Sequence, residues 1–191
     1  MTRIVAGSLG GRVLAVPPAG TRPTSERVRE ALFSRLDHLG AVAGARVLDG
    51  YAGSGALGLE AASRGAASVT LVELGKAAAE VCRRNVAHLG LRDRVQVVKD
   101  RVETFVTRPV TAGWDLVLLD PPYDVPGETV DRILADLVPA LAAEAVVVVE
   151  RSARSAAPTW PEGLAELSAK TYGETVVHLA ERMPTEPATV G

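Results

Sequence analysis

The stretch VLDGYAGSGALG, residues 47–58, decides the fold of this chain. It begins as a short apolar run, passes through a glycine-rich loop and continues into residues that favour a helix. Glycines in such a loop let the backbone approach a ligand closely, and the amino end of the helix offers unpaired N–H groups. The stretch therefore predicts a buried strand, a turn that cradles a nucleotide, and a helix.

The residues after this loop alternate between apolar runs and helical patterns. We expect strands at residues 68–73, 94–99, 114–120 and 145–150, and helices at 57–64, 76–89 and 129–141, with a short helix after Asp100. Strands that are continuously apolar belong inside parallel sheets covered on both faces, and strands alternating with helices give a doubly wound α/β fold. Residues 164–172 and 175–180, joined around Gly173, predict an antiparallel hairpin at the sheet edge.

The residues before the loop predict a small extension. Residues 3–7 and 12–16 are β-prone runs separated by Ser-Leu-Gly-Gly, which predicts a hairpin. Thr24 or Ser25 can cap a helix that runs to about Leu39, and Gly40 stands where a C-terminal cap belongs. We therefore divide the chain into a hairpin extension at 1–20, an α/β domain at 21–183 and a flexible tail at 184–191.

Composition excludes several classes of protein. The 191 residues are 47% hydrophobic and 23% charged, which is typical of one globular domain. Cys82 is the only cysteine and the three histidines are scattered, so we expect neither an internal disulfide nor a metal site. No apolar run is long enough to span a bilayer and no signal peptide opens the chain, so we expect a cytoplasmic protein without a membrane partner.

Charge is distributed unevenly along the chain. Residues 1–40 hold six arginines against three acidic residues, whereas the remainder holds 15 basic and 20 acidic residues. A basic end on an acidic body suggests that one edge of the protein holds a polyanion, although a solvated helix face would give the same pattern. The arginines that could neutralise phosphates are Arg3, Arg12, Arg22, Arg27 and Arg29.

Two cofactors remain compatible with the glycine loop. Residues 53–58 satisfy the Gly-x-Gly-x-x-Gly fingerprint of NAD-binding domains, and Glu73 follows Gly53 by 20 positions, as that fingerprint requires. However, Asp49 would repel a pyrophosphate, whereas it could bind the ammonium end of a methionyl group. Asp100 could accept a hydrogen bond from the amino group of an adenine. Such an acidic pocket favours the sulfonium cofactor S-adenosylmethionine over a dinucleotide.

The tetrapeptide Asp120-Pro121-Pro122-Tyr123, at the end of the fourth expected strand, indicates the reaction. The exocyclic amine of a nucleobase is a poor nucleophile because its lone pair is delocalised into the ring. The Asp120 carboxylate and the Pro121 carbonyl can accept its two N–H groups, and the prolines fix the direction of that carbonyl. Tyr123 offers a face on which an extruded base can stack. The predicted catalysis rests on positioning and electrostatics.

With these motifs in place, the chain resembles the RsmD-type guanine-N2 methyltransferases of the bacterial small ribosomal subunit. The resemblance rests on residues 3–7, residues 11–12, the segment TRPTSERVREALF at 21–33, the loop at 48–61 and the tetrapeptide. It implies a Rossmann-like class I methyltransferase fold, S-adenosylmethionine as cofactor, and methylation of the N2 amine of a guanine in 16S rRNA on the small ribosomal subunit. Tyr51 stands where the family usually has phenylalanine.

The resemblance and the residue arguments together give three sets of site residues. The expected cofactor site consists of Asp49, Tyr51, Gly53, Ser54, Gly55, Glu73, Leu74, Asp100 and Arg101. The expected catalytic set is Asp120, Pro121, Pro122 and Tyr123. The expected RNA contacts are Arg3, Arg12, Arg22, Thr24, Arg27 and Arg29.

Three alternatives stay open. An adenine-N6 DNA methyltransferase would use the same tetrapeptide, although no separate target-recognition domain is evident. An NAD-dependent oxidoreductase would fit the glycine loop but has no use for Asp120-Pro121-Pro122-Tyr123. A non-catalytic ribosome-assembly factor could have retained the fold. The sequence gives no reason to expect more than a monomer, so we expect a monomer.

Overall fold

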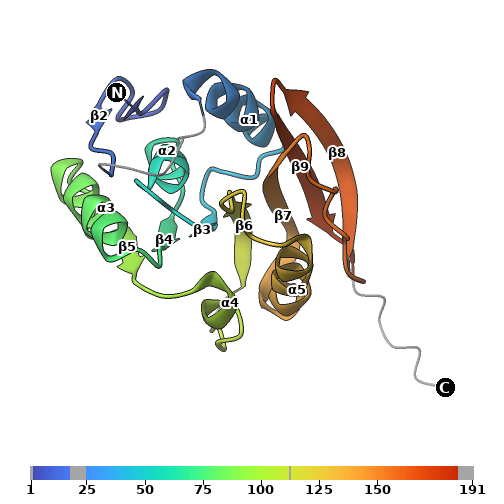
Figure 1. Cartoon of the computed structure of the whole chain (residues 1–191). Helices are drawn as coiled ribbons and strands as arrows, with labels where there is room; N and C mark the ends of the chain where they lie inside the picture. Colours follow the sequence, from blue (N-terminus) through green and yellow to red (C-terminus); the bar gives the residue numbers. More distant parts are fainter. Residues whose placement is uncertain (1, 18–24, 112, 185–191) are drawn as a thin grey trace.

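The chain was analysed as a computed structural model that describes residues 2–17, 25–111 and 113–184. Within these residues a sheet is sandwiched between two layers of helices (Figure 1). Helices α1 (Glu26–His38), α2 (Ala56–Ser63) and α3 (Lys76–His88) cover one face. The short α4 (Val102–Phe105) and α5 (Gly127–Leu137), which continues into the 3-10 turn η1 (Val138–Ala140), cover the other.

The described sheet has seven strands in the order β5-β4-β3-β6-β7-β9-β8. The parallel strands are β3 (Arg46–Gly50), β4 (Ser68–Val72), β5 (Val95–Val98), β6 (Trp114–Leu119) and β7 (Leu141–Ser152). The antiparallel pair β8 (Leu164–Tyr172) and β9 (Thr175–Arg182) completes one edge. This arrangement confirms the predicted α/β fold with its antiparallel C-terminal hairpin, and it is the class I methyltransferase fold.

The order of strands places the ligand end of the sheet. The chain leaves β3 toward β4 on one side, while β6 pairs with β3 on the other, so the topology switches direction at β3. Ligands of open α/β sheets bind beyond the carboxyl ends of the strands at such a switch point. Gly50 and Leu119 are paired in register, so the glycine loop after β3 and the tetrapeptide after β6 emerge side by side.

Two apolar clusters, one on each face of the sheet, form the core. One joins α1, α2 and α3 to the sheet, and the other joins α4 and α5 to the opposite face. Alternate residues of the central strands supply both clusters: Val47 belongs to the first cluster and Leu48 to the second. Burial of both faces explains why β3, β6 and β7 lack the alternation of a half-exposed strand.

The amino-terminal extension forms the predicted hairpin in a shorter form. Strands β1 (Thr2–Arg3) and β2 (Val13–Leu14) pair antiparallel, with Thr2 opposite Leu14. Helix α1 is capped as predicted, because the Ser25 hydroxyl accepts a hydrogen bond from the Val28 N–H at 3.2 Å. On α1, Arg29 and Phe33 are buried against the core, whereas Leu39, just after the helix, is exposed.

Other differences from the predicted elements are small and have local causes. Helix α5 ends at Leu137, earlier than expected, because Pro139 lacks the N–H that an α-helix needs and the chain tightens into η1. Strand β7 begins four residues before the expected start, at Leu141, where it pairs with Trp114. The flexible tail predicted at 184–191 lies outside the described residues except for Pro184. No helix in the described ranges is both long and apolar enough to cross a membrane.

Candidate active site

The glycine loop turns sharply between β3 and α2. Gly53 and Gly55 have φ values of +59° and +81°, a left-handed conformation that residues with a Cβ atom rarely adopt. A Cβ added to Gly53 would meet only the Tyr51 carbonyl oxygen within 4 Å, at 3.9 Å, so a ligand can approach the backbone there. A Cβ on Gly58 would lie 2.4 Å from Leu71, so this third glycine serves the contact of α2 with β4.

Tyr51 also has a positive φ, +65°, although it carries a large side chain. Such a conformation is uncommon outside glycine and is concentrated at functional sites. The next residue, Ala52, donates its N–H to the Val72 carbonyl at 3.0 Å, which fixes the loop against β4. Burial and the nearby Glu103 carboxylate raise the pKa of the half-buried Tyr51 hydroxyl.

Glu73 holds the loop from the neighbouring strand end. Its two carboxylate oxygens accept the N–H groups of Gly53 at 2.8 Å and Gly75 at 2.7 Å. Each carboxylate oxygen retains a second lone pair, so the same group can also accept hydroxyl donors from a ligand. Leu74, the next residue, is 54% exposed and offers an apolar surface beside the loop.

Asp49 lies at the carboxyl end of β3 and is only 1% exposed. One of its oxygens accepts the Gly58 N–H at 2.8 Å. Burial, together with the negative charges of Asp120 and Glu73, raises the pKa of this carboxyl to about 7, although the hydrogen bond from Gly58 lowers it. The ends of three neighbouring strands therefore bring three acidic groups together, which makes this end of the sheet suitable for a cation.

Asp100 follows β5 and completes the acidic rim. It accepts the N–H of Arg101 at 2.8 Å, and its other oxygen pairs with Arg108. Arg101, exposed at the start of α4, was predicted beside the cofactor, whereas Arg108 was not. Any donor that binds Asp100 must share this carboxylate with Arg108.

Asp120, Pro121, Pro122 and Tyr123 leave β6 as a loop that turns immediately. The Val125 N–H donates to the Pro122 carbonyl at 3.0 Å, closing the turn. Asp120 is half-buried and Pro121 is buried, whereas Tyr123 is 64% exposed. Arg151, near the end of β7, donates a hydrogen bond to the Val125 carbonyl at 3.2 Å and so joins the turn to the neighbouring strand.

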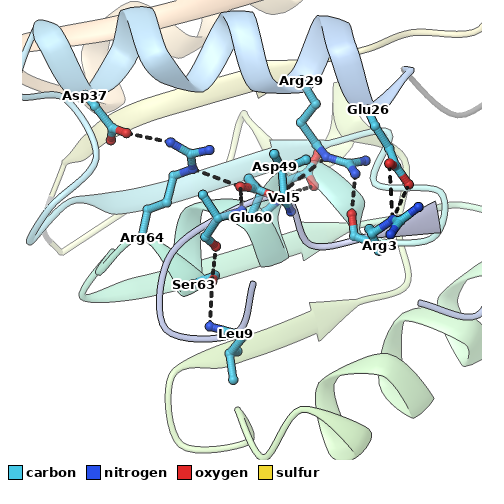
Figure 2. Close-up of polar contacts among 12 residues, drawn as sticks. Arg3, Val5, Leu9, Glu26, Arg29, Asp37, Asp49, Glu60, Ser63 and Arg64 are labelled. Atoms are coloured by element: carbon cyan, nitrogen blue, oxygen red, sulfur yellow. Dashed lines mark hydrogen bonds and ion pairs between the residues drawn. The ribbon is translucent and has the colours of Figure 1, made fainter. Parts of the chain in front are cut away.

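A network centred on Glu60 fastens the extension to α2 (Figure 2). The Glu60 carboxylate is fully buried and accepts the N–H groups of Val5 at 2.7 Å and Ala6 at 3.0 Å. It also accepts Arg64 Nε at 2.8 Å and lies 3.6 Å from Arg29 Nε. We call Val5, Ala6, Arg29, Glu60, Ser63 and Arg64 the hairpin anchor.

A second contact joins the extension directly to the glycine loop. Asn85 on α3 is buried, and its amide group forms two hydrogen bonds of 2.9 Å with the backbone of Ala15. The same side chain donates to the Ser54 carbonyl at 2.9 Å. Ser54, a predicted cofactor residue, is thus held through Asn85 to the segment that follows the hairpin.

The predicted RNA contacts divide into separate groups. Arg3, Arg12 and Arg27 are exposed, and Arg3 pairs with Glu26 at 3.3 Å. The prediction that Arg29 contacts RNA is wrong. Its side chain is 0% exposed, donates a hydrogen bond to the Arg3 carbonyl and faces Glu60, so RNA cannot reach it. Arg22 and Thr24 lie outside the described residues.

Sequence reasoning missed Glu60 and Asn85. A signal for Glu60 was present, since it is the one charged residue in the otherwise small and apolar helix ALGLEAAS. A buried carboxylate requires partners, so its position on a helix between two apolar layers indicates an internal ion pair. Nothing in the local pattern marks Asn85, because its partners lie 70 and 31 residues away. The described residues contain no cluster of His, Cys, Asp and Glu that could hold a metal ion.

The fold and this arrangement of glycine loop, acidic rim and tetrapeptide define the class as a class I methyltransferase. Comparison with known proteins agrees. The family model described as Conserved hypothetical protein 95 matches residues 2–181. Ribosomal RNA small subunit methyltransferase D of Escherichia coli is 37% identical over 183 residues, covering 94% of this chain and 89% of the relative.

Two further relatives extend the comparison. The solved structure of "Putative methyltransferase yhhF" from Escherichia coli superposes with a TM-score of 0.83 at 34% identity, covering 96% of this chain and 99% of that one. A tRNA1(Val) (adenine(37)-N6)-methyltransferase of Shewanella putrefaciens is 35% identical over 79 residues, 41% of this chain and 33% of the relative. The chain therefore belongs to the Conserved hypothetical protein 95 family, together with ribosomal RNA small subunit methyltransferase D.

Proposed function

We propose that this protein transfers a methyl group from S-adenosylmethionine to the exocyclic N2 amine of guanine 966 in 16S rRNA of the small ribosomal subunit. The observation that carries the proposal is the register of β3 and β6. Gly50 pairs with Leu119, so the loop that would hold the cofactor and the tetrapeptide that would hold the amine begin at adjacent positions of one sheet edge.

The residues of the first loop suit the proposed cofactor. Gly53 leaves its backbone open to a ligand, and the Glu73 carboxylate retains lone pairs for two ribose hydroxyls. Leu74 offers apolar surface to an adenine ring, and Asp100 an acceptor for its amino group. Bound there, the cofactor would supply an electrophilic methyl group. The acidic groups Asp49, Glu73 and Asp120 favour its positive charge over a dianionic dinucleotide.

The tetrapeptide would prepare the amine for attack. The Asp120 carboxylate and the Pro121 carbonyl accept its two N–H groups, which directs the nitrogen lone pair toward the methyl group. The largely exposed Tyr123 ring is available for stacking with an extruded base. The amine loses a proton after transfer, when it has become acidic, so a strong general base is unnecessary.

RNA would be held by exposed arginines of the extension. Arg3 and Arg12 lie on the hairpin, which the hairpin anchor and Asn85 fix beside the glycine loop. Reversing both charges should weaken RNA binding and leave S-adenosylmethionine binding unchanged. Calorimetry with each ligand measures the two affinities separately, and an equal loss of both would contradict this assignment.

Identification of the methylated nucleoside tests the proposed function. The protein is incubated with labelled S-adenosylmethionine and, in parallel, naked 16S rRNA, small subunits or DNA, and digested products are separated. We expect label in N2-methylguanosine. Transfer to N6-methyladenosine would favour an adenine-N6 enzyme, a candidate supported by the 79-residue match to a tRNA adenine-N6-methyltransferase. Absence of label from every substrate, with nicotinamide binding, would favour an oxidoreductase.

A further inference from the structure

Part of the sheet face that carries α4 and α5 is left uncovered. On β4, Val69 and Leu71 point into the apolar cluster under α2 and α3, so Ser68 and Thr70 face the other side. Gln96 on β5 faces the same side by the same alternation. Helix α4 has only four residues and covers the carboxyl half of the strands, so these polar residues lie in the open.

A depression of about 530 Å³ occupies this uncovered face at the amino ends of β3 to β6, opposite the cofactor end. Its lining includes Ser68, Thr70, Gln96 and Trp114, together with Arg46, Arg92 and Arg94. A second depression, of about 290 Å³, lies beside it and is lined by Arg83, Arg92 and three valines. Arg92 and the edge strand β5 belong to both.

The charge of this region departs from the acidic body that the composition suggested. Residues 76–101 carry seven basic and three acidic residues. Arg46 is neutralised by Asp115, with a bidentate pair of 2.7 and 2.8 Å. In contrast, neither Arg92 nor Arg94 forms an ion pair with any described residue, and Asp93 is the one carboxylate among the described lining residues.

This basic region continues from the amino-terminal extension. Asn85 joins α3 to Ala15, immediately after the hairpin, so α3 lies between the hairpin and β5. Figure 1 shows the same order, with the hairpin, α3 and β5 in succession along one side of the molecule. Arg83 and Arg84 are exposed on α3 along that path.

We infer that α3, the turn at Arg92–Arg94 and the groove beside Trp114 form a second RNA-binding surface that follows the phosphate backbone away from the modified base. The inference rests on the proposed function. Arginine pairs with phosphate through two parallel hydrogen bonds, and hydroxyl and amide side chains donate to phosphate and ribose oxygens. The Trp114 ring gives an unstacked base a platform. Arg92 and Arg94 are the central contacts, since neither forms an ion pair with a described residue.

The test compares the double variant Arg92→Gln and Arg94→Gln with a matched control, Arg132→Gln. Arg132 is exposed on α5 and lines neither depression. Binding of naked 16S rRNA and of small subunits is measured at several salt concentrations, with S-adenosylmethionine affinity and melting temperature as checks on folding. We expect the double variant to bind RNA about tenfold more weakly at low salt. Its salt slope should fall by about 1.4, since each single-stranded phosphate contact contributes roughly 0.7.

The outcomes separate this inference from the proposed function. Unchanged RNA affinity and salt slope in the double variant, while the wild-type protein methylates 16S rRNA, would overturn the second surface alone. An equal loss per arginine removed in Arg132→Gln would also overturn it, because the effect would then be one of total charge. A wild-type protein that neither binds nor methylates small-subunit RNA would overturn both. A selective loss with normal cofactor affinity supports the surface.

Discussion

The hairpin anchor and the tetrapeptide flank the same glycine loop, yet they hold their carboxylates in opposite ways. Glu60 is completely enclosed, and its oxygens accept two backbone N–H groups and an arginine. Asp120 is half-buried beside Tyr123, whose ring is largely exposed. A fully enclosed carboxylate bound by its own chain can only stabilise the fold, whereas Asp120 is partly exposed at the strand end where ligands of such sheets bind.

The comparison also explains why the extension sits so close to the site. A hairpin of two-residue strands is not stable alone in water. Here its backbone donors are bound by Glu60 and Ser63, and Asn85 fixes the following segment to the loop at Ser54. The hairpin, which we propose to bind RNA, therefore keeps a fixed position relative to the glycine loop.

Removal of Glu60 should have the largest effect on stability. In Glu60→Ala the buried guanidinium of Arg29 loses its nearest carboxylate and two backbone donors lose their acceptor. Breaking a buried pair from one side costs about 3–5 kcal/mol. Urea unfolding of this variant and of Glu60→Gln, which keeps one acceptor, measures the loss.

The control is Glu80→Ala on α3, whose carboxylate is 61% exposed and pairs with Arg83 at the surface. Surface pairs contribute little, so its free energy of unfolding should change by less than about 1 kcal/mol. Equal stability of the Glu60 and Glu80 variants would show that the hairpin anchor is not structural.

Removal of Asp120 should instead affect activity and leave stability nearly intact. Loss of one pre-organised acceptor at the reacting centre typically lowers the rate by about 100- to 1000-fold. In Asp120→Ala, kcat for labelled methyl transfer to small subunits should fall by that factor, with the melting temperature close to that of the wild type. An unchanged kcat would show that Asp120 does not position the amine, whereas a wild-type phenotype in cells despite a lost kcat would favour the non-catalytic assembly factor.

The glycine loop and the tetrapeptide could be predicted from the sequence, whereas the hairpin anchor could not, because the two regions depend on different kinds of contact. Residues 49–58 and 120–123 are contiguous motifs whose position at strand ends follows from the order of elements alone. The anchor depends on contacts between residues 54 and 55 positions apart, which no local pattern encodes. The charge of Arg29 therefore predicts an RNA contact, whereas in the folded protein this arginine is buried beside Glu60.

Asp49 interacts with both regions. It accepts the N–H of Gly58 on α2, the helix that carries the hairpin anchor, and the charge of Asp120 affects its carboxyl. Its pKa is raised from 3.8 to about 7, so the folded protein binds one more proton than the unfolded chain between these values. Stability should therefore decrease as pH rises from about 4 to 7, by at most about 1.4 kcal/mol per pH unit from this group. Urea unfolding across this range should show a shallower decrease in Asp49→Asn than in the wild type. The same slope in both proteins would mean that Asp49 titrates normally.

Tyr123 should have the smallest effect, confined to the RNA substrate. Base stacking on an aromatic ring contributes about 1–3 kcal/mol, so Tyr123→Ala should raise KM for small subunits or lower kcat by roughly 5- to 100-fold. Tyr123→Phe keeps the ring and should stay within about threefold of the wild type, which separates stacking from hydrogen bonding by the hydroxyl. Because the side chain is 64% exposed, neither change should alter the melting temperature. If Tyr123→Phe lost as much activity as Tyr123→Ala, the hydroxyl would be the functional group, and the tetrapeptide would bind its target by a polar contact at this position.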